Sequence, residues 1–178
     1  MKITIFGGAQ PQAGSEAYEE ARLLGTLLAK NGHTVITGGY RGTMEAVSRG
    51  ANETGGHVIG VTCIDIENWR GSKANEWVKE EIKKQTLVDR LQVLIGECDA
   101  AMALSGGSGT LTEISLMWNL MVIETLPKKP LILIGDGWKH TLDSFFAEFS
   151  VYMPLSQAEL LYFAKDVQQA VGLLEERD

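Results

Sequence analysis

Cysteine and histidine are scarce in this sequence, and their scarcity excludes several kinds of site. The chain has two cysteines, Cys63 and Cys98, which do not form a CxxC pair. A disulfide framework or a zinc knuckle is therefore not expected. The three histidines, His33, His57 and His140, form neither an HxxxH nor an HExxH spacing. We expect no metal site and no other cofactor.

Basic charge is also in short supply. Sixteen lysines and arginines stand against 23 aspartates and glutamates, which gives a formal net charge of −7. A protein that binds a nucleic acid polymer needs a basic field, so no such partner is expected. Any phosphate must be held locally, by backbone N–H groups and a few arginines.

Long apolar runs are missing as well. No run approaches the roughly 18 residues of a membrane-spanning helix, and the first eight residues are too short and too soon polar to be a signal peptide. Apolar residues still make up 44% of the chain and charged residues 22%, as in a globular protein with a core. We expect a single domain over residues 1–178, cytoplasmic and with no membrane partner.

Short apolar runs alternate with segments of helical periodicity. The runs are continuous, which is typical of parallel strands buried on both faces. The expected strands are 3–6, 34–37, 57–62, 100–104, 131–134 and 160–164, and the expected helices are 15–30, 42–54, 86–97, 109–123, 141–149 and 166–176. This alternation predicts an α/β fold, a single Rossmann-like, doubly wound parallel sheet in a three-layer sandwich.

Glycine is abundant, with 20 residues. Three glycine pairs, at 7–8, 38–39 and 106–107, stand where an expected strand ends and a helix is about to begin, whereas the pair at 55–56 follows a helix and is explained by capping. Ligands of doubly wound sheets bind at that strand edge. Numbering the expected strands along the chain, we predict the order 3-2-1-4-5, in which the turns at 7–8 and 106–107 flank one crevice.

Residues 63–78 form the one long stretch without periodicity, and long loops in compact domains are commonly functional. Trp69, Arg70 and Lys73 lie in this stretch. They could stack on a base or contact a phosphate, or they could simply anchor a partly exposed loop.

The segment 104–113 is the strongest functional signal. Gly106, Gly107 and Gly109 let backbone N–H groups face a ligand without obstruction, and the following helix adds its unpaired donors and positive dipole end. These features predict an anion site suited to a phosphate. Thr110 adds a hydroxyl, and the Glu113 carboxylate is expected over the crevice.

Two structural explanations of the same segment stay open. Thr110 and Glu113 have the spacing of a capping box, in which the glutamate bonds the backbone of the cap residue, and the glycines could be a tight turn. The GGxG spacing also differs from the GxGxxG fingerprint of dinucleotide-binding proteins, so a full NAD site is not favoured.

The core at 106–113, Gly-Gly-x-Gly-Thr-x-x-Glu, resembles the PGGxGTxxE motif of the LOG-like proteins. These are cytokinin riboside 5′-monophosphate phosphoribohydrolases, formerly described as possible lysine decarboxylases. Residues 38–47 are similar to the family's GGGxxGxMxAV segment, and residues 55–61 match its GGxVIGV strand. Arg90 precedes Ser105 by the spacing at which the family's catalytic arginine precedes the motif proline. The resemblance covers residues 3–135.

The resemblance implies hydrolysis of the N-glycosidic bond of a nucleoside 5′-monophosphate, giving free base and ribose 5-phosphate. It implies Glu113 and Arg90 as catalytic residues. The residues implied in binding the phosphate or nucleotide are Gly8, Gly38, Gly39, Arg41, Gly42, Thr43, Gly106, Gly107, Ser108, Gly109 and Thr110.

Each catalytic residue has an expected task. Glu113 would stabilise the positive charge at the anomeric carbon, orient the ribose hydroxyls or activate water. Arg90 would pair with the phosphate or hold the ribose; the alternative is a surface salt bridge with Asp89 or Glu97. No partner acid for the leaving base is evident.

Two departures from the family pattern keep a second hypothesis open. Ser105 replaces the motif proline, and Leu91 replaces the lysine that usually follows the arginine. The run at 44–51 also resembles a sister branch that includes molybdenum-cofactor carrier proteins, which bind without hydrolysing. The alternative function is therefore a non-catalytic nucleotide or molybdopterin-cofactor carrier.

The expected helix at 109–123 is apolar on more than one face. Met117, Trp118, Leu120 and Met121 follow one another closely along it. Such a helix suits either a core position or a dimer interface. Members of the resembled family are typically dimers built on this region, so we expect a homodimer whose other partner is a small-molecule nucleotide.

Overall fold

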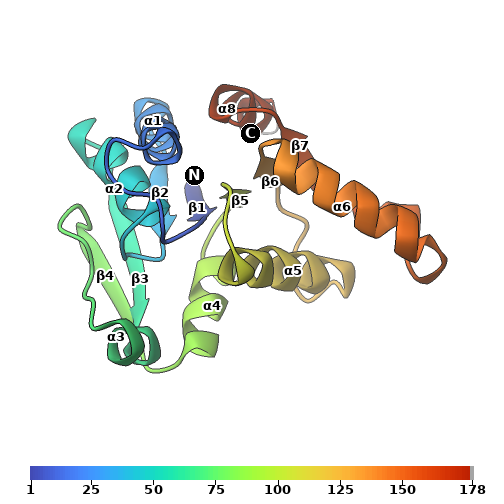
Figure 1. Cartoon of the computed structure of the whole chain (residues 1–178), viewed down its shortest axis with the longest axis horizontal. Helices are drawn as coiled ribbons and strands as arrows, with labels where there is room; N and C mark the ends of the chain where they lie inside the picture. The colour runs from blue at the N-terminus through green and yellow to red at the C-terminus, as the bar shows by residue number, and fades with distance from the viewer. Residues whose placement is uncertain (177–178) are drawn as a thin grey trace.

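A single parallel sheet forms the middle layer of the molecule (Figure 1). The computed structural model describes residues 1–176, so the last two residues of the expected domain lie outside the described part. The strands are β1 (Lys2–Phe6), β2 (Thr34–Thr37), β3 (Val58–Cys63), β4 (Glu80–Lys84), β5 (Ala100–Ala103), β6 (Leu131–Ile134) and β7 (Leu161–Ala164). The helices are α1 (Glu16–Lys30), α2 (Thr43–Glu53), α3 (Ile64–Arg70), α4 (Leu87–Gly96), α5 (Ser108–Val122), α6 (Asp136–Phe149), the short 3-10 turn η1 (Ser150–Tyr152), α7 (Leu155–Ala158) and α8 (Val167–Glu175).

The strand order confirms the prediction. The sheet runs β4-β3-β2-β1-β5-β6-β7, with every neighbouring pair parallel. β1 lies at the centre, where Ile3 pairs with Val35 of β2 on one side and with Ala100 of β5 on the other. The turns after β1 and β5 are therefore neighbours at the same edge of the sheet.

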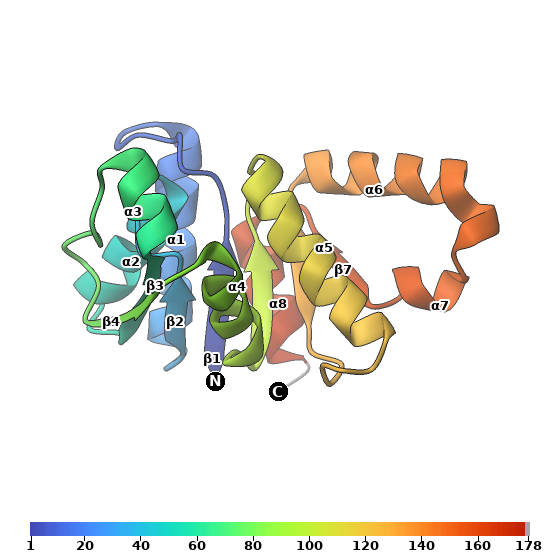
Figure 2. The same cartoon turned by 90° about the horizontal axis from the view of Figure 1, so that it is seen from below.

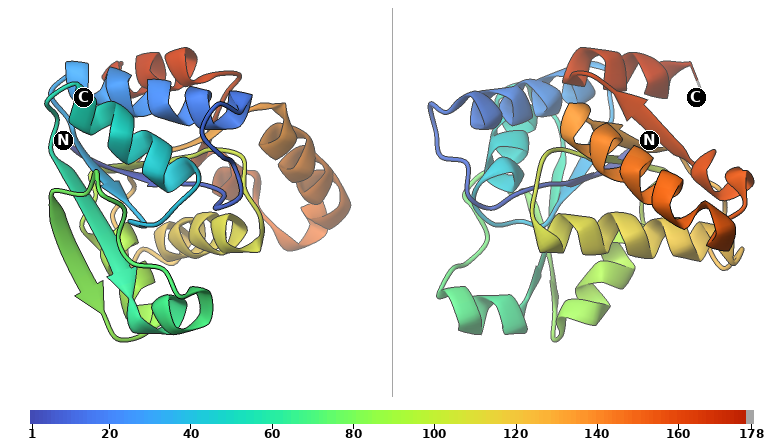
Figure 3. Two further views of the ribbon diagram at one scale, coloured as in Figure 1. Left: turned by 60° about the vertical axis from the view of Figure 1, so that its left-hand side comes forward. Right: turned by 45° about the vertical axis from the view of Figure 1, so that its right-hand side comes forward.

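Helices cover both faces, as a three-layer sandwich requires. Apolar side chains of α1, α2 and α8 pack on one face, and those of α4, α5 and α6 pack on the other. Figure 3 shows α1, α2 and α8 along one side of the sheet and α5 along the opposite side. Because successive strand residues point to opposite faces, Ile5 belongs to the first core and Phe6 to the second.

Four elements were not predicted from the sequence: α3, β4 and the short η1 and α7. α3 lies inside the stretch expected to be irregular, and it has no fully buried residue, so it carries no apolar stripe to reveal it. β4 has the charged sequence Glu-Glu-Ile-Lys-Lys and is an edge strand. Charged side chains are common in edge strands because they hinder pairing with a strand of another molecule. A search for apolar runs therefore does not find β4. α6 also begins at Asp136, five residues before the expected start.

Backbone contacts tie three loops together at the carboxyl edge of the sheet. The Gly8 N–H donates to Ser105 O over 3.1 Å, which joins the turns after β1 and β5. The Thr43 N–H and hydroxyl both donate to Gly8 O, over 2.9 and 3.0 Å, and so attach the start of α2. These bonds hold the turns after β1 and β5 and the start of α2 together at this edge of the sheet. Figure 2 shows the same elements from below.

No helix within residues 1–176 is both long and apolar enough to cross a membrane.

Candidate functional site

A cavity of about 450 Å³, here called the main cavity, lies at the carboxyl edge of the sheet. Its walls come from the turn after β1, the helices α3 and α4, and the start of α5. The lining residues are Gly7, Gly8, Ala9, Gln10, Tyr40, Met44, Ile66, Trp69, Arg70, Leu87, Arg90, Leu91, Gly107, Ser108, Gly109, Thr110, Thr112 and Glu113. The cavity thus collects most of the residues of the 104–113 motif.

The N-terminus of α5 supplies hydrogen-bond donors to the main cavity. Gly107 is the N-cap, and no side chain caps the helix. The first N–H groups of a helix have no partner within it, so those of Ser108, Gly109 and Thr110, which all line the cavity, are free to bind a ligand. A Cβ built on Gly107 would meet no protein atom within 4 Å. The space above Gly107 is therefore open to a ligand.

The capping-box interpretation of Thr110 and Glu113 is wrong. The helix begins at Ser108, so Thr110 lies within its first turn rather than at the cap. Thr110 and Glu113 are both buried. The Thr110 hydroxyl lies over Gly106, where a Cβ would approach it to 2.1 Å, so residue 106 has room only for glycine.

Glu113 forms a buried ion pair with Arg90. Glu113 Oε1 lies 3.6 Å from Arg90 Nη1, and the two residues are 9% and 4% exposed. Burial raises the pKa of the Glu113 carboxyl to about 7, because the charged form loses its hydration, while the Arg90 guanidinium works in the opposite direction. A carboxyl with this pKa can hold, release or accept a proton near neutral pH.

Arg90 is anchored from behind the cavity. Its Nε donates to Val61 O over 2.7 Å and its Nη2 donates to Gly38 O over 3.2 Å. Its guanidinium also lies 5.7 Å from the centre of the Tyr40 ring. The alternative of a surface salt bridge is wrong, because Arg90 is buried and its charged partner is Glu113. Arg90 is thus a fixed positive charge whose Nη1 faces Glu113.

Asp89 and Glu97, the two expected surface partners, are engaged elsewhere. Asp89 accepts a hydrogen bond from the Thr86 hydroxyl over 2.8 Å, at the start of α4. Glu97 lies 3.8 Å from Lys2 Nζ in an exposed pair. Neither carboxylate is available to Arg90.

The loop after β2 lies partly behind the site. A Cβ on Gly38 would come within 2.0 Å of Arg90 Nη2, so glycine is required for Arg90 to reach the carbonyl. Gly39, with a φ of +77°, lies against Gly60 and Thr62 of β3. Thr43 holds Gly8 rather than facing the main cavity. Among the loop residues expected to bind phosphate, Arg41 and Gly42 line a second, smaller cavity instead.

The walls of the main cavity that α3 and α4 form are largely apolar, with Arg70 also among the lining residues. Their apolar side chains are Ile66 and Trp69 of α3 and Leu87 and Leu91 of α4. The Trp69 side chain is 76% exposed, with the Arg70 guanidinium 4.8 Å from its ring centre. Lys73, the third residue noted in this stretch, does not line the cavity. Leu91, which replaces the family's lysine, forms part of this apolar wall.

Sequence reasoning missed Tyr40 as a site residue. Its hydroxyl donates to Cys63 O over 3.0 Å and accepts from the Cys63 N–H over 2.8 Å. The side chain is buried and presents its ring to Arg90. Nothing in the local sequence signals this contact, because Cys63 is distant in the chain. Within residues 1–176, no three His, Cys, Asp or Glu side chains come together as a metal site.

The fold and the site define a Rossmann-like α/β protein with a buried Arg–Glu pair beside a glycine-rich helix N-terminus. More narrowly, the SLOG cluster4 family model matches residues 1–154, so the chain belongs to that family.

Named relatives agree with the resemblance to LOG-like proteins. A cytokinin riboside 5′-monophosphate phosphoribohydrolase of Mycobacterium tuberculosis is 30% identical over 139 residues, covering 78% of this chain and 72% of its own. One from Arabidopsis thaliana is 30% identical over 182 residues, covering 98% of this chain and 82% of its own. The family assignment made from the motifs is therefore confirmed.

Solved structures show the same fold. The molybdenum cofactor binding protein of the phototrophic bacterium Rippkaea orientalis superposes with a TM-score of 0.76 at 24% identity, covering 98% of this chain and 95% of its own. This likeness confirms the Rossmann-like α/β architecture.

Proposed function

We propose that the protein hydrolyses the N-glycosidic bond of a nucleoside 5′-monophosphate to a free base and ribose 5-phosphate. The observation that carries the proposal is Glu113, a buried carboxyl with a pKa of about 7 that lies beside Arg90 and lines a cavity open to the unpaired N–H groups of α5. The relatives named as phosphoribohydrolases support it.

The cavity fits such a substrate in one orientation. The phosphate binds the N–H groups of Ser108 to Thr110, where the helix dipole favours an anion. Thr110 and Glu113 are three residues apart in α5, about 4.5 Å along the axis, which suits the 5′-phosphate and the anomeric carbon of one ribose. The base then lies toward the largely apolar walls, against Ile66, Trp69 and Leu87.

Glu113 acts on the anomeric carbon. As the C1′–N bond breaks, its electron pair leaves with the base and positive charge grows at C1′, which the Glu113 carboxylate stabilises. The oxygen of a water molecule bonds to C1′, and the proton that it loses passes to the carboxylate. The base takes up one proton from solvent as it leaves, and Glu113 afterwards releases its proton to solvent, which restores the carboxylate. Among the described residues that line the main cavity, Glu113 is the only carboxyl.

Arg90 stabilises the ionised form of the Glu113 carboxyl. The positive charge 3.6 Å away favours the ionised form of Glu113 against the effect of burial. Two carbonyl oxygens hold the guanidinium behind the cavity, so it cannot move onto the phosphate without losing both bonds. In the proposed mechanism Arg90 holds the Glu113 carboxylate in place and favours its ionised form.

A direct experiment tests this proposal. The protein is incubated with a panel of nucleoside 5′-monophosphates, and free bases and ribose 5-phosphate are separated by chromatography. Release of equal amounts of base and ribose 5-phosphate from at least one nucleotide is expected. Absence of any release across the panel would overturn the proposal.

The second candidate is a carrier that binds a nucleotide or molybdopterin cofactor without turnover. Ser105 and Leu91 favour it, because both depart from the hydrolase pattern, and Leu91 places an apolar side chain where the hydrolases have a cation. Tight binding of a nucleotide or pterin in the same panel, with no product, is the result expected for a carrier.

We further propose that the protein is a homodimer. Met117 and Met121 are core residues, and Trp118 of α5 is covered by Phe146 of α6, with ring centres 5.8 Å apart. The apolar character of α5 is thus largely satisfied within the chain. Leu111 of α5 and Ile123 at its end stay exposed, and exposed apolar side chains also lie along the adjoining segment from α6 to α7: Phe145, Phe149, Val151, Tyr152 and Leu155. An exposed apolar patch of this kind supports an interface.

A further inference from the structure

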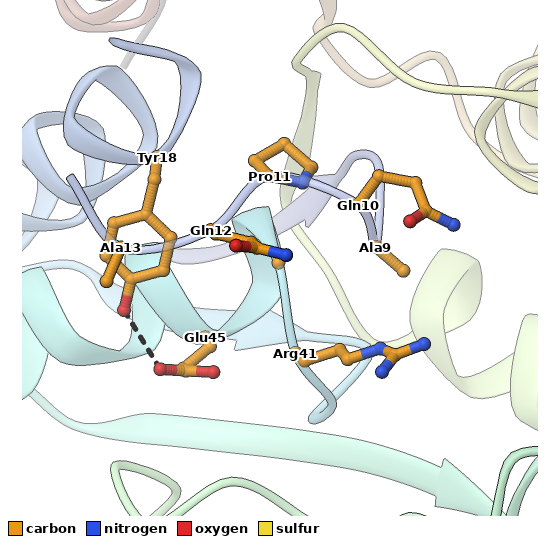
Figure 4. A pocket seen from close by; sticks show the side chains of 9 residues that line it. Ala9, Gln10, Pro11, Gln12, Ala13, Tyr18, Arg41 and Glu45 are labelled. Carbon is orange, nitrogen blue, oxygen red and sulfur yellow. Dashed lines mark hydrogen bonds between the residues drawn. The ribbon is translucent and has the colours of Figure 1, made fainter. Parts of the chain in front are cut away.

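A second cavity, of about 290 Å³, adjoins the main one. Figure 4 shows it between the loop after β1, the start of α1 and the start of α2. Its lining residues are Ala9, Gln10, Pro11, Gln12, Ala13, Tyr18, Arg41, Gly42 and Glu45. Neither the family motif nor the proposed reaction uses the far end of this cavity, at Tyr18 and Glu45.

The walls carry polar groups that have open hydrogen-bonding capacity. The buried Tyr18 hydroxyl donates to Glu45 Oε1 over 3.0 Å and fixes that carboxylate, while Oε2 has no protein donor among the described residues. The side chains of Gln10, Gln12 and Arg41 likewise make no hydrogen bond or ion pair within residues 1–176. In Figure 4, Gln12, Arg41 and Glu45 lie around the same space.

The second cavity begins at the phosphate end of the main cavity. Ala9 and Gln10 line both cavities. The preceding residue, Gly8, lies against the turn before α5, where a Cβ would be 3.5 Å from Gly106 Cα. A group attached to a phosphate at the α5 N-terminus would therefore pass Ala9 and Gln10 and enter the second cavity.

The lining favours a particular kind of group. The Arg41 guanidinium, near the junction of the cavities, presents a fork of N–H donors that matches a phosphate. Glu45 would repel a phosphate but accepts hydrogen bonds from hydroxyls, and the two glutamine amides both donate and accept. At about 30 Å³ per water molecule, the cavity holds the volume of about ten waters, which is room for a sugar.

We propose that the second cavity binds the sugar of a nucleoside diphosphate sugar, with its second phosphate on Arg41 and its hydroxyls on Glu45, Gln10 and Gln12. This inference rests on the proposed binding of a nucleotide phosphate at the α5 N-terminus. It extends the ligand class from nucleoside monophosphates to nucleotides whose phosphate carries a hydroxylated group. It involves binding alone and requires no additional chemical step.

Calorimetric titration of the intact protein with AMP, ADP and ADP-glucose, and with the matching uracil series, tests the inference. In the better-bound series, the diphosphate sugar is expected to bind at least tenfold more tightly than the monophosphate, and the plain diphosphate to lie between them. A diphosphate sugar that binds no more tightly than its monophosphate would overturn the inference.

Substitutions in the second cavity test which residues bind the sugar and the second phosphate. Glu45→Gln keeps an acceptor for Tyr18 and removes the charge, and it is expected to weaken ADP-glucose about tenfold while AMP changes less than twofold. Glu148→Gln, the same change on the exposed surface of α6, is expected to alter neither. Arg41→Gln is expected to weaken ADP and ADP-glucose together. Equal losses for AMP and ADP-glucose in Glu45→Gln would contradict a sugar site.

The same measurements separate this inference from the proposed function. If AMP is hydrolysed but the diphosphate sugar gains no affinity, only the second-cavity inference fails. If ADP-glucose binds through Glu45 while no monophosphate is hydrolysed, the inference stands and the hydrolase proposal fails. If none of the nucleotides binds, both fail.

Discussion

At the scale of single residues, Glu113 presents an unusual combination. It is an acid whose pKa burial raises to about 7, yet an arginine stands 3.6 Å away. A buried ion pair of this kind is not explained by stability alone. The hydration that the two charges lose on burial offsets their mutual attraction. Carboxyls with strongly raised pKa values are common among groups that move protons.

Replacing Glu113 by glutamine separates catalysis from binding. Glu113→Gln preserves shape but removes the negative charge that matters in the transition state. Turnover of a nucleoside monophosphate is expected to fall about 10²-fold or more, while the affinity measured by calorimetry changes little because α5 holds the phosphate. Glu148→Gln serves as the control. Unchanged turnover in Glu113→Gln would show that the carboxyl is not catalytic.

The raised pKa of Glu113 also predicts how stability changes with pH. The folded protein keeps this proton up to about pH 7, whereas an unfolded chain releases it near 4.5. The folded state therefore binds more protons between these values, and the contribution of Glu113 to the free energy of unfolding falls as pH rises through this window, by up to about 3 kcal/mol.

Urea unfolding of the wild type and Glu113→Gln at pH 5, 6, 7 and 8 measures this contribution. The difference in unfolding free energy is expected to move in favour of the variant as pH rises to about 7 and to level off above it. A difference that is constant over the whole range would mean that Glu113 ionises normally.

At the scale of secondary-structure elements, the N-terminus of α5 is the feature on which binding depends. Gly107 caps the helix with a φ of −98°, a conformation that other residues adopt, and a Cβ there meets no protein atom. The protein tolerates a side chain at this position, whereas a bound phosphate does not have room for one.

Gly107→Val is accordingly expected to weaken nucleotide binding at least tenfold, about 1.4 kcal/mol, with the thermal midpoint nearly unchanged. Calorimetry measures the affinity. Gly172→Val, a matched substitution at an exposed and equally open position of α8, should leave affinity unaltered. Full affinity in a folded Gly107→Val protein would place the phosphate elsewhere.

The same elements show what a sequence can predict. The turns at 7–8 and 106–107 could be placed at one crevice because apolar strands and glycine pairs are local signals, and their adjacency follows from the rules of doubly wound sheets. The environment of Arg90 could not be predicted. It depends on carbonyls 29 and 52 positions away in the chain, at Val61 and Gly38, and backbone carbonyls leave no mark in a sequence. The ion pair between Arg90 and Glu113 could not be predicted either, because it depends on the same buried position of the Arg90 guanidinium.

At the scale of the whole molecule, the apolar surface from α6 to α7 lies far from the candidate site. Figures 1 and 2 place α6 and α3 at opposite ends of the sheet. Tyr152 and Leu155 are 82% and 83% exposed, so they contribute little to folding of a single chain. A second copy that covers them would remove this apolar area from water.

The homodimer is tested by light scattering coupled to size-exclusion chromatography. The wild type is expected at twice the chain mass of 19.4 kDa, and a Tyr152→Asp, Leu155→Asp variant at the single-chain mass, because two carboxylates in an apolar interface stay unpaired. Trp69→Asp, an equally drastic change at the opposite end of the molecule, should remain dimeric. A wild type that elutes as a single chain at all concentrations would contradict the dimer. A double variant that stays dimeric would instead move the interface away from α6 to α7, because these exposed side chains could not then be the ones that the second copy covers.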